Sequence, residues 1–209
     1  MSLPYDPVEA VRHLRKADRK LAKVIDKAGD FRLQLSKVSN VFDTLAYAII
    51  SQQLSGKAAK TIFSRFEALV PARRGSKQRP LGVVATSLEN LRTVGMSNAK
   101  ARAIQDLAAK SVAGEIPSLK KLLIMDDEEI IEQLTAVRGI GRWTVEMLLI
   151  FHLGRPDILP VDDLGVRKGF MVLNGHNEMP RPKELIAQTE HWRPFRSVAS
   201  WYCWRACEF

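Results

Sequence analysis

The stretch that decides the fold of this chain is Leu134-Thr-Ala-Val-Arg-Gly139-Ile-Gly141-Arg-Trp143-Thr144. It contains a helix end, a tight Gly-x-Gly turn and the start of a new helix. Glycines at 139 and 141 let the backbone adopt positive φ and approach a ligand without a Cβ clash. A helix that opens at Arg142 directs its unpaired N–H groups and positive dipole end outward. The turn therefore predicts a phosphate site made by Gly139, Gly141, Arg142 and Thr144.

Carbonyl oxygens of the same turn form a candidate cation site. Those of Thr135, Val137 and Ile140 could hold a monovalent ion, Na⁺ or K⁺, that joins the turn to a second phosphate. The alternative is an ordinary corner between two helices, closed by a glycine C-cap, which needs no ligand. A lone Gly-x-Gly favours that alternative, so the interpretation depends on the rest of the chain.

The composition favours a polyanionic partner. The 209 residues include 32 Lys and Arg against 23 Asp and Glu, a net charge of +9. No apolar run approaches the roughly 20 residues of a membrane span, and no signal peptide is visible at the N-terminus. Cys203 and Cys207 suit neither a long-loop disulfide nor a complete metal-ligand set. We expect a protein of the bacterial cytoplasm and nucleoid, or of the eukaryotic nucleus.

Apolar residues recur at helical spacing along almost the whole chain, which predicts an all-α protein. A buried helix is expected over residues 41–52, capped by Ser39 or Asn40. Further helices are expected over 56–69, over 88–94 and 97–113 behind serine caps, and over 142–153 and 163–173. Residues 71–80 are expected to form a basic loop that connects two lobes, with Arg73, Arg74, Gly75, Lys77 and Arg79.

Four motifs, in the expected order, resemble those of the helix–hairpin–helix DNA glycosylase superfamily. They are Ile50-Ser51-Gln52-Gln53-Leu54-Ser55, Val137-Arg-Gly139-Ile-Gly141-Arg-Trp143-Thr144, Pro156-Asp157-Ile-Leu-Pro160 with Asp163-Leu-Gly165-Val, and Trp192-Arg193-Pro194-Phe195-Arg196-Ser197. Within the superfamily the chain is most similar to the alkylation-repair branch, 3-methyladenine DNA glycosylase II, in its compact form. Arg138 departs from the pattern, because the hairpin often carries proline there.

The resemblance implies a two-lobed helical glycosylase fold with the active-site cleft between the lobes. Residues 1–209 would form one unit, with a wedge-bearing lobe of 35–115 and a hairpin and catalytic lobe of 1–34 plus 116–209. The implied enzyme hydrolyses the N-glycosidic bond of alkylated purines, of the 3-methyladenine and 7-methylguanine types, and leaves an abasic site. Its partner is double-stranded DNA containing such bases. We expect a monomer without membrane contact, redox cofactor or catalytic metal.

The resemblance places the catalytic acid at Asp163 rather than Asp162, because the family's acid directly precedes the Leu-Gly-Val helix start. Loss of the base builds positive charge on the sugar, which a nearby carboxylate stabilises while it positions or deprotonates a water. An aspartate at a helix N-cap is held in one rotamer, and local amides keep it ionised. Simple N-capping is the alternative.

Position 143 decides the reaction type. Relatives that also cut the strand carry a lysine there, which forms a Schiff base with the sugar. Trp143 cannot form one, so we predict a monofunctional enzyme without lyase activity. Its ring could instead pack against an extruded cationic base. Trp204 and Met147 are further candidates for the base pocket, although core packing is the alternative for both.

Extrusion of a nucleotide leaves a gap in the duplex, which such enzymes fill with a side chain. The predicted wedge is Gln53, with Leu54 and Ser55 beside it at the minor groove; an ordinary polar turn is the alternative. Two other functions stay open. One is a glycosylase for another damaged base, and the other is a non-catalytic helix–hairpin–helix module that binds damaged DNA.

Overall fold

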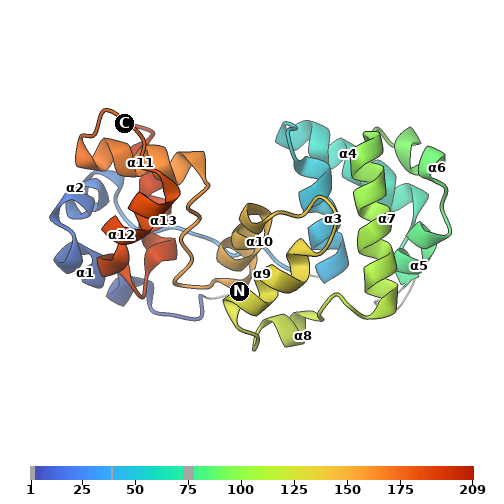
Figure 1. Ribbon diagram of the computed structural model, residues 1–209, viewed down its shortest axis with the longest axis horizontal. Helices are drawn as coiled ribbons and strands as arrows, with labels where there is room; N and C mark the ends of the chain where they lie inside the picture. Colours follow the sequence, from blue (N-terminus) through green and yellow to red (C-terminus); the bar gives the residue numbers. More distant parts are fainter. Residues whose placement is uncertain (1–2, 39, 73–77) are drawn as a thin grey trace. The chain divides into compact units, whose positions relative to one another are not determined.

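The computed structural model describes residues 3–38, 40–72 and 78–209. Within those ranges all regular secondary structure is helical and there is no strand, so the predicted all-α class is confirmed (Figure 1). Its helices are α1 (Pro7–Ala17), α2 (Arg19–Ala28), α3 (Val41–Ser51), α4 (Gly56–Leu69), α5 (Gln78–Val84), α6 (Leu88–Thr93), α7 (Asn98–Ala113), α8 (Leu119–Leu122), α9 (Asp127–Thr135), α10 (Arg142–Leu148), the π-helix η1 (Leu149–Leu153), α11 (Leu164–Asn174), α12 (Pro182–Gln188), the 3-10 helix η2 (Glu190–Trp192) and α13 (Arg196–Ala206).

The chain divides into two compact units. The first unit is Met1–Lys37 with Glu146–Phe209, and the second unit is Val38–Val145. Residues 116–145, grouped from sequence with the two chain ends, have their contacts inside the second unit. The chain passes from the second unit to the first within α10.

The first unit packs the two ends of the chain together. Its buried core joins α1 and α2 to α11 and α13, with Leu14, Leu21, Phe170, Trp192 and Tyr202 among its members. Helices α11 and α13 touch backbone to backbone at Gly169, where an added Cβ would lie 1.9 Å from the carbonyl oxygen of Cys203. Any larger residue at this point would force the two helices apart. Glycine therefore allows the close approach.

The second unit is built around α7, which packs against α3, α5 and α6. The apolar side of α3 is buried as its spacing predicts, and Asn40 caps the helix by accepting from the Phe42 amide at 2.9 Å. Ser39 lies outside the described residues. No helix in the described part of the chain is long and apolar enough to cross a membrane.

The prediction of a basic loop over residues 71–80 is wrong at its C-terminal end. Arg79 lies in α5 and is only 6% exposed, because its guanidinium pairs with Asp43 at 2.9 Å and donates to the Val70 carbonyl at 2.9 Å. Burial raises the pKa of the Asp43 carboxyl, although the nearby Arg79 acts in the opposite direction. The charge of Arg79 therefore has a structural role. Arg73, Arg74, Gly75 and Lys77 lie outside the described residues.

Candidate active site

The Gly-x-Gly turn forms the predicted hairpin, which we define as residues 136–141 between α9 and α10. Gly139 has φ +78°, and a Cβ there would lie 3.1 Å from the Ala103 Cβ. The expectation of positive φ is wrong for Gly141, which lacks it and where an added Cβ would meet nothing within 4 Å. Among the described residues, the N–H groups of Gly139 and Gly141 have no hydrogen-bond acceptor. These two amides are available to a ligand.

Other predicted phosphate and cation groups already have partners inside the second unit. The amide of Thr144 donates to the Gly141 carbonyl at 3.0 Å. The Arg142 guanidinium pairs with both carboxylate oxygens of Glu128, and this hydrogen bonding lowers the pKa of Glu128. The Val137 carbonyl accepts from the Ile140 amide at 3.1 Å, although a carbonyl oxygen has a second lone pair. Within the described residues no group of three or more His, Cys, Asp or Glu could hold a metal ion.

The predicted wedge residues lie on the turn between α3 and α4, and we call residues 52–55 the wedge loop. Gln53 is exposed and has φ +57°, a left-handed conformation that side chains other than glycine seldom adopt. Leu54 is 38% exposed. The Ser55 hydroxyl caps α4 by accepting from the Ala58 amide at 3.3 Å, so it already has a structural role. Gln52 donates from Nε2 to the Gly139 carbonyl at 2.9 Å, which ties the wedge loop to the hairpin.

Asp163 is the N-cap of α11, as predicted, and is 9% exposed. Its Oδ1 accepts from the Val166 amide at 2.8 Å and from the indole Nε1 of Trp204 at 2.8 Å. Asp162 is exposed. Gly165 makes this arrangement possible, because a Cβ there would lie 2.7 Å from Cδ1 of Trp204 and 3.1 Å from the carboxylate. The carboxylate is thus oriented by two donors from different helices.

The three residues predicted for the base pocket have different surroundings. Trp204 is half-buried and stacks on Phe151, with ring centroids 5.4 Å apart. Trp143 is 45% exposed, and Met147 is half-buried one turn further along α10. The structure brings Trp204 to Asp163 in the first unit. It brings the wedge loop to the hairpin in the second unit.

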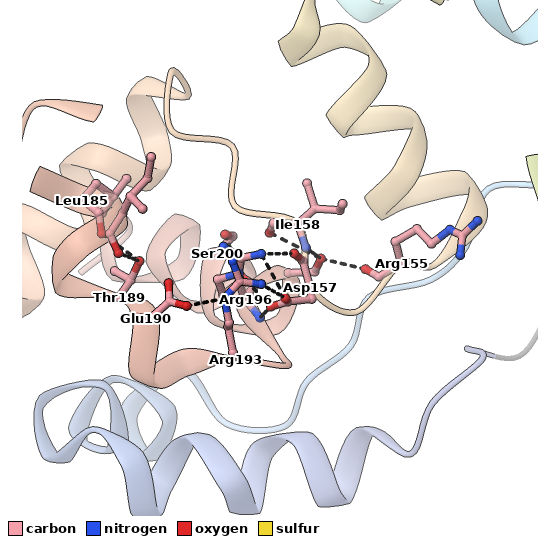
Figure 2. Close-up of polar contacts among 11 residues, drawn as sticks. Arg155, Asp157, Ile158, Leu185, Thr189, Glu190, Arg193, Arg196 and Ser200 are labelled. Atoms are coloured by element: carbon pink, nitrogen blue, oxygen red, sulfur yellow. Dashed lines mark hydrogen bonds and ion pairs between the residues drawn. The ribbon is translucent and has the colours of Figure 1, made fainter. Parts of the chain in front are cut away.

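A polar clamp holds the loop that leads to Asp163 (Figure 2). Arg196 binds Asp157 through Nε at 2.7 Å and Nη2 at 2.9 Å, and Arg193 adds a contact at 2.6 Å. The Ser197 hydroxyl donates to the Arg155 carbonyl at 2.7 Å and accepts from the Ile158 amide at 2.9 Å. Two motifs recognised separately in the sequence therefore form one structural feature. Both motifs were quoted from the sequence, but no pattern in it indicated that they would pair.

Comparisons with known proteins point to one family. Residues 46–194 match the HhH-GPD superfamily of base excision DNA repair proteins. DNA-3-methyladenine glycosylase 1 of Schizosaccharomyces pombe is 35% identical over 92% of this chain and 84% of its own length. The structure of the S. pombe 3-methyladenine DNA glycosylase in complex with abasic DNA has a TM-score of 0.81, with 34% identity over 96% of this chain and 97% of that one. A DNA-3-methyladenine glycosidase from Bacillus halodurans also has a TM-score of 0.81, with 34% identity over 99% of this chain and 91% of that one.

Proposed function

The chain belongs to the HhH-GPD superfamily of base excision DNA repair proteins, and on that premise we propose that it hydrolyses the N-glycosidic bond of alkylated purines in duplex DNA. The substrates are purines of the 3-methyladenine and 7-methylguanine types, and the product is an abasic site. The observation that carries the proposal is the Asp163 carboxylate, nearly buried and held by Val166 and Trp204. Relatives named as 3-methyladenine glycosylases, one bound to abasic DNA, support the substrate class.

Asp163 acts on charge that develops in the sugar. An alkylated purine is cationic, so it leaves with little help from a general acid, and the transition state resembles an oxocarbenium ion. A carboxylate fixed in advance stabilises that cation without reorganisation and can position or deprotonate the attacking water. The two donors to Oδ1 supply that fixed orientation.

The proposed enzyme is monofunctional. Trp143 has no amine, so it cannot displace the base and form the Schiff base on which strand cleavage depends. Its exposed ring offers a π face to an extruded cationic base. Treatment of the reaction with borohydride should trap no protein–DNA adduct. A trapped adduct would contradict this part of the proposal.

DNA binding is assigned to the second unit. The free amides of Gly139 and Gly141 bind a phosphate, with Arg142 and Thr144 shaping the start of α10. A monovalent cation held by the carbonyls of Thr135, Val137 and Ile140 would bridge the hairpin to a neighbouring phosphate. Gln53 fills the gap left by the extruded nucleotide, flanked by Leu54 and Ser55.

A base-release assay on methylated duplex DNA tests the proposal. Wild-type protein should release methylated purines, and Asp163→Asn should lower the rate roughly 100-fold or more, since one electrostatic group of this kind contributes that much. Asp162→Asn is the matched control, because the neighbouring carboxylate is exposed and should leave the rate unchanged.

Three outcomes would contradict the proposal or one of its parts. Tight DNA binding without any abasic product would indicate a non-catalytic binding module. Release of another damaged base, and not of methylated purines, from a panel of lesion duplexes would reassign the substrate. An unchanged rate in Asp163→Asn would remove the catalytic role of that residue.

A further inference from the structure

Helix α7 turns one face toward both DNA-binding segments of the second unit. Lys100, Ala103 and Asp106 are spaced three residues apart, so their side chains lie along one side of the helix. Lys100 reaches the wedge loop, whereas Ala103 and Asp106 reach the hairpin. Figure 1 shows α7 beside α3, the helix that ends in the wedge loop.

The contact at the wedge loop is made by the Lys100 ammonium. Its Nζ donates to the carbonyls of Ile50 at 2.8 Å and Gln52 at 2.7 Å. Carbonyls at a helix C-terminus have no partner within the helix, so a cation from another helix satisfies them. Burial lowers the pKa of Lys100. Gln53 follows directly with φ +57°, a conformation that persists only where its surroundings enforce it.

The contact at the hairpin is made by a carboxylate and a small side chain. Oδ2 of Asp106 accepts from the Arg138 amide at 2.8 Å. Ala103 lies against Gly139, where even a Cβ would be only 3.1 Å away. Gln52 then links the two segments directly through the Gly139 carbonyl. Each of these three parts, the wedge loop, the hairpin and α7, therefore contacts the other two.

We propose that α7 is the common support of the wedge loop and the hairpin, with Lys100 and Asp106 as positioning residues. Lys100 acts through the backbone of Gln53 on the extrusion of the base. Asp106 acts through Arg138 on the presentation of the hairpin amides to phosphate. The proposal rests on the proposed function, since it takes the wedge loop and hairpin as DNA contacts.

Lys100→Met tests the wedge half of this proposal. The substrates are one duplex with a single 7-methylguanine paired to cytosine, and the same methylated strand unpaired. Lys100→Met should lower the single-turnover rate on the paired lesion roughly 10- to 100-fold, because small misplacements cost that much, and should change the rate on the unpaired lesion far less. Arg102→Met is the matched control, since it removes an exposed cation from the same helix and should behave like wild type.

Gln52→Ala covers the case in which Lys100→Met fails to fold, as judged by circular dichroism and thermal melting. This variant leaves Lys100 in place and removes the link to the hairpin, so it should show the same selective loss on the paired lesion. Equal rates of wild type and folded Lys100→Met on the paired lesion would overturn the role of Lys100, and equal rates of wild type and Gln52→Ala would overturn the role of the link between the wedge loop and the hairpin. An equal loss on both substrates would overturn the corresponding role as well, since it indicates general damage.

Asp106→Ala tests the hairpin half of the proposal through DNA binding alone, with no base release. Binding to undamaged duplex should weaken roughly 10-fold, because the hairpin amides lose their fixed orientation toward phosphate. Lys110→Met is the matched control, since it breaks the ion pair with Asp106 at 2.8 Å but leaves the carboxylate that holds Arg138. Unchanged binding in Asp106→Ala would overturn this half. A wild-type protein that excises no base would instead overturn the proposed function, and this binding test would still apply.

Discussion

At Asp163 the two interpretations that the sequence left open describe the same geometry. The carboxylate caps α11 through the Val166 amide, and the same oxygen accepts from the Trp204 indole. Capping fixes the rotamer, and a fixed rotamer is what electrostatic stabilisation of a cationic sugar requires. Gly165 allows the indole to come this close. N-capping therefore supports the catalytic role proposed for this residue.

Trp204→Phe separates the indole's hydrogen bond from its aromatic ring. The phenyl ring can still stack on Phe151, but it cannot donate to Asp163. A hydrogen bond to a charged group contributes about 1.5–3 kcal/mol, so the single-turnover release rate should fall roughly 10-fold or more. Trp201→Phe, in the same helix, is the control and should keep the wild-type rate. A wild-type rate in Trp204→Phe would mean that the indole N–H does not orient the acid.

The sequence predicted those properties of single residues that depend only on residues nearby in the chain. Asp163 as an N-cap and Gly139 with positive φ both follow from residue type within a few positions. The partners of Arg142 and Arg79 lie 14 and 36 positions away, at Glu128 and Asp43, and no pattern in the sequence indicates those pairs. The charge of Arg142 suggested phosphate contact and that of Arg79 a basic loop. The fold pairs Arg142 with Glu128 at the surface and Arg79 with Asp43 in the interior.

At the scale of elements, α13 contacts both ends of the loop that leads to Asp163. Its first turn binds Asp157 and Arg155 through Arg196 and Ser197, and its last turn reaches Asp163 through Trp204. The helix therefore sets where the loop begins and where it ends. In the second unit α7 has a comparable role, because its side chains contact both the wedge loop and the hairpin.

Arg196→Met tests the clamp of Figure 2. The side chain is only 14% exposed, and its loss leaves Asp157, itself 22% exposed, without its main partner. Unfolding free energy should fall by about 2 kcal/mol, because the pair is partly buried and lies between the exposed and the fully buried case. Arg193→Met is the control, since that side chain is 47% exposed and surface pairs contribute about 0–1 kcal/mol. Urea denaturation of both variants measures the difference, and equal losses would contradict the clamp.

Helix boundaries were predictable where a cap or glycine marks them. The helices α4 and α7 begin and end where the serine caps and apolar spacing place them. The helix expected over residues 142–153 changes to a π-helix at Leu149. This change was not predictable, because the apolar periodicity of the sequence carries no information about a single inserted residue. The clamp and the α7 support join segments far apart in sequence, so no local pattern could reveal them.

At the scale of the whole molecule, one carboxylate links the two ends of the chain within the first unit. Asp18 caps α2 and also accepts from the indole of Trp192 at 2.9 Å and from His191 at 3.2 Å. Residues 1–37 and 146–209 form one compact unit, so contacts such as these help to hold the two segments together. This unit carries the proposed catalytic acid, and its stability therefore limits activity.

Acidification should weaken the contacts of Asp18 with Trp192 and His191 over a defined pH range. Burial alone would raise the pKa of Asp18, but hydrogen bonds from the Leu21 amide, Trp192, His191 and the Lys20 amide together lower it below the ordinary 3.8. A lowered pKa means that the contribution of Asp18 to stability is complete above pH 3.8 and is lost as pH falls through the folded-state pKa. The indole N–H resonance of Trp192 should titrate with a midpoint below 3.8. In Asp18→Asn, which keeps a good N-cap, that titration should disappear. A midpoint at or above 3.8 would show that the four hydrogen bonds do not outweigh burial, and that the link between the chain ends is weaker than its geometry indicates.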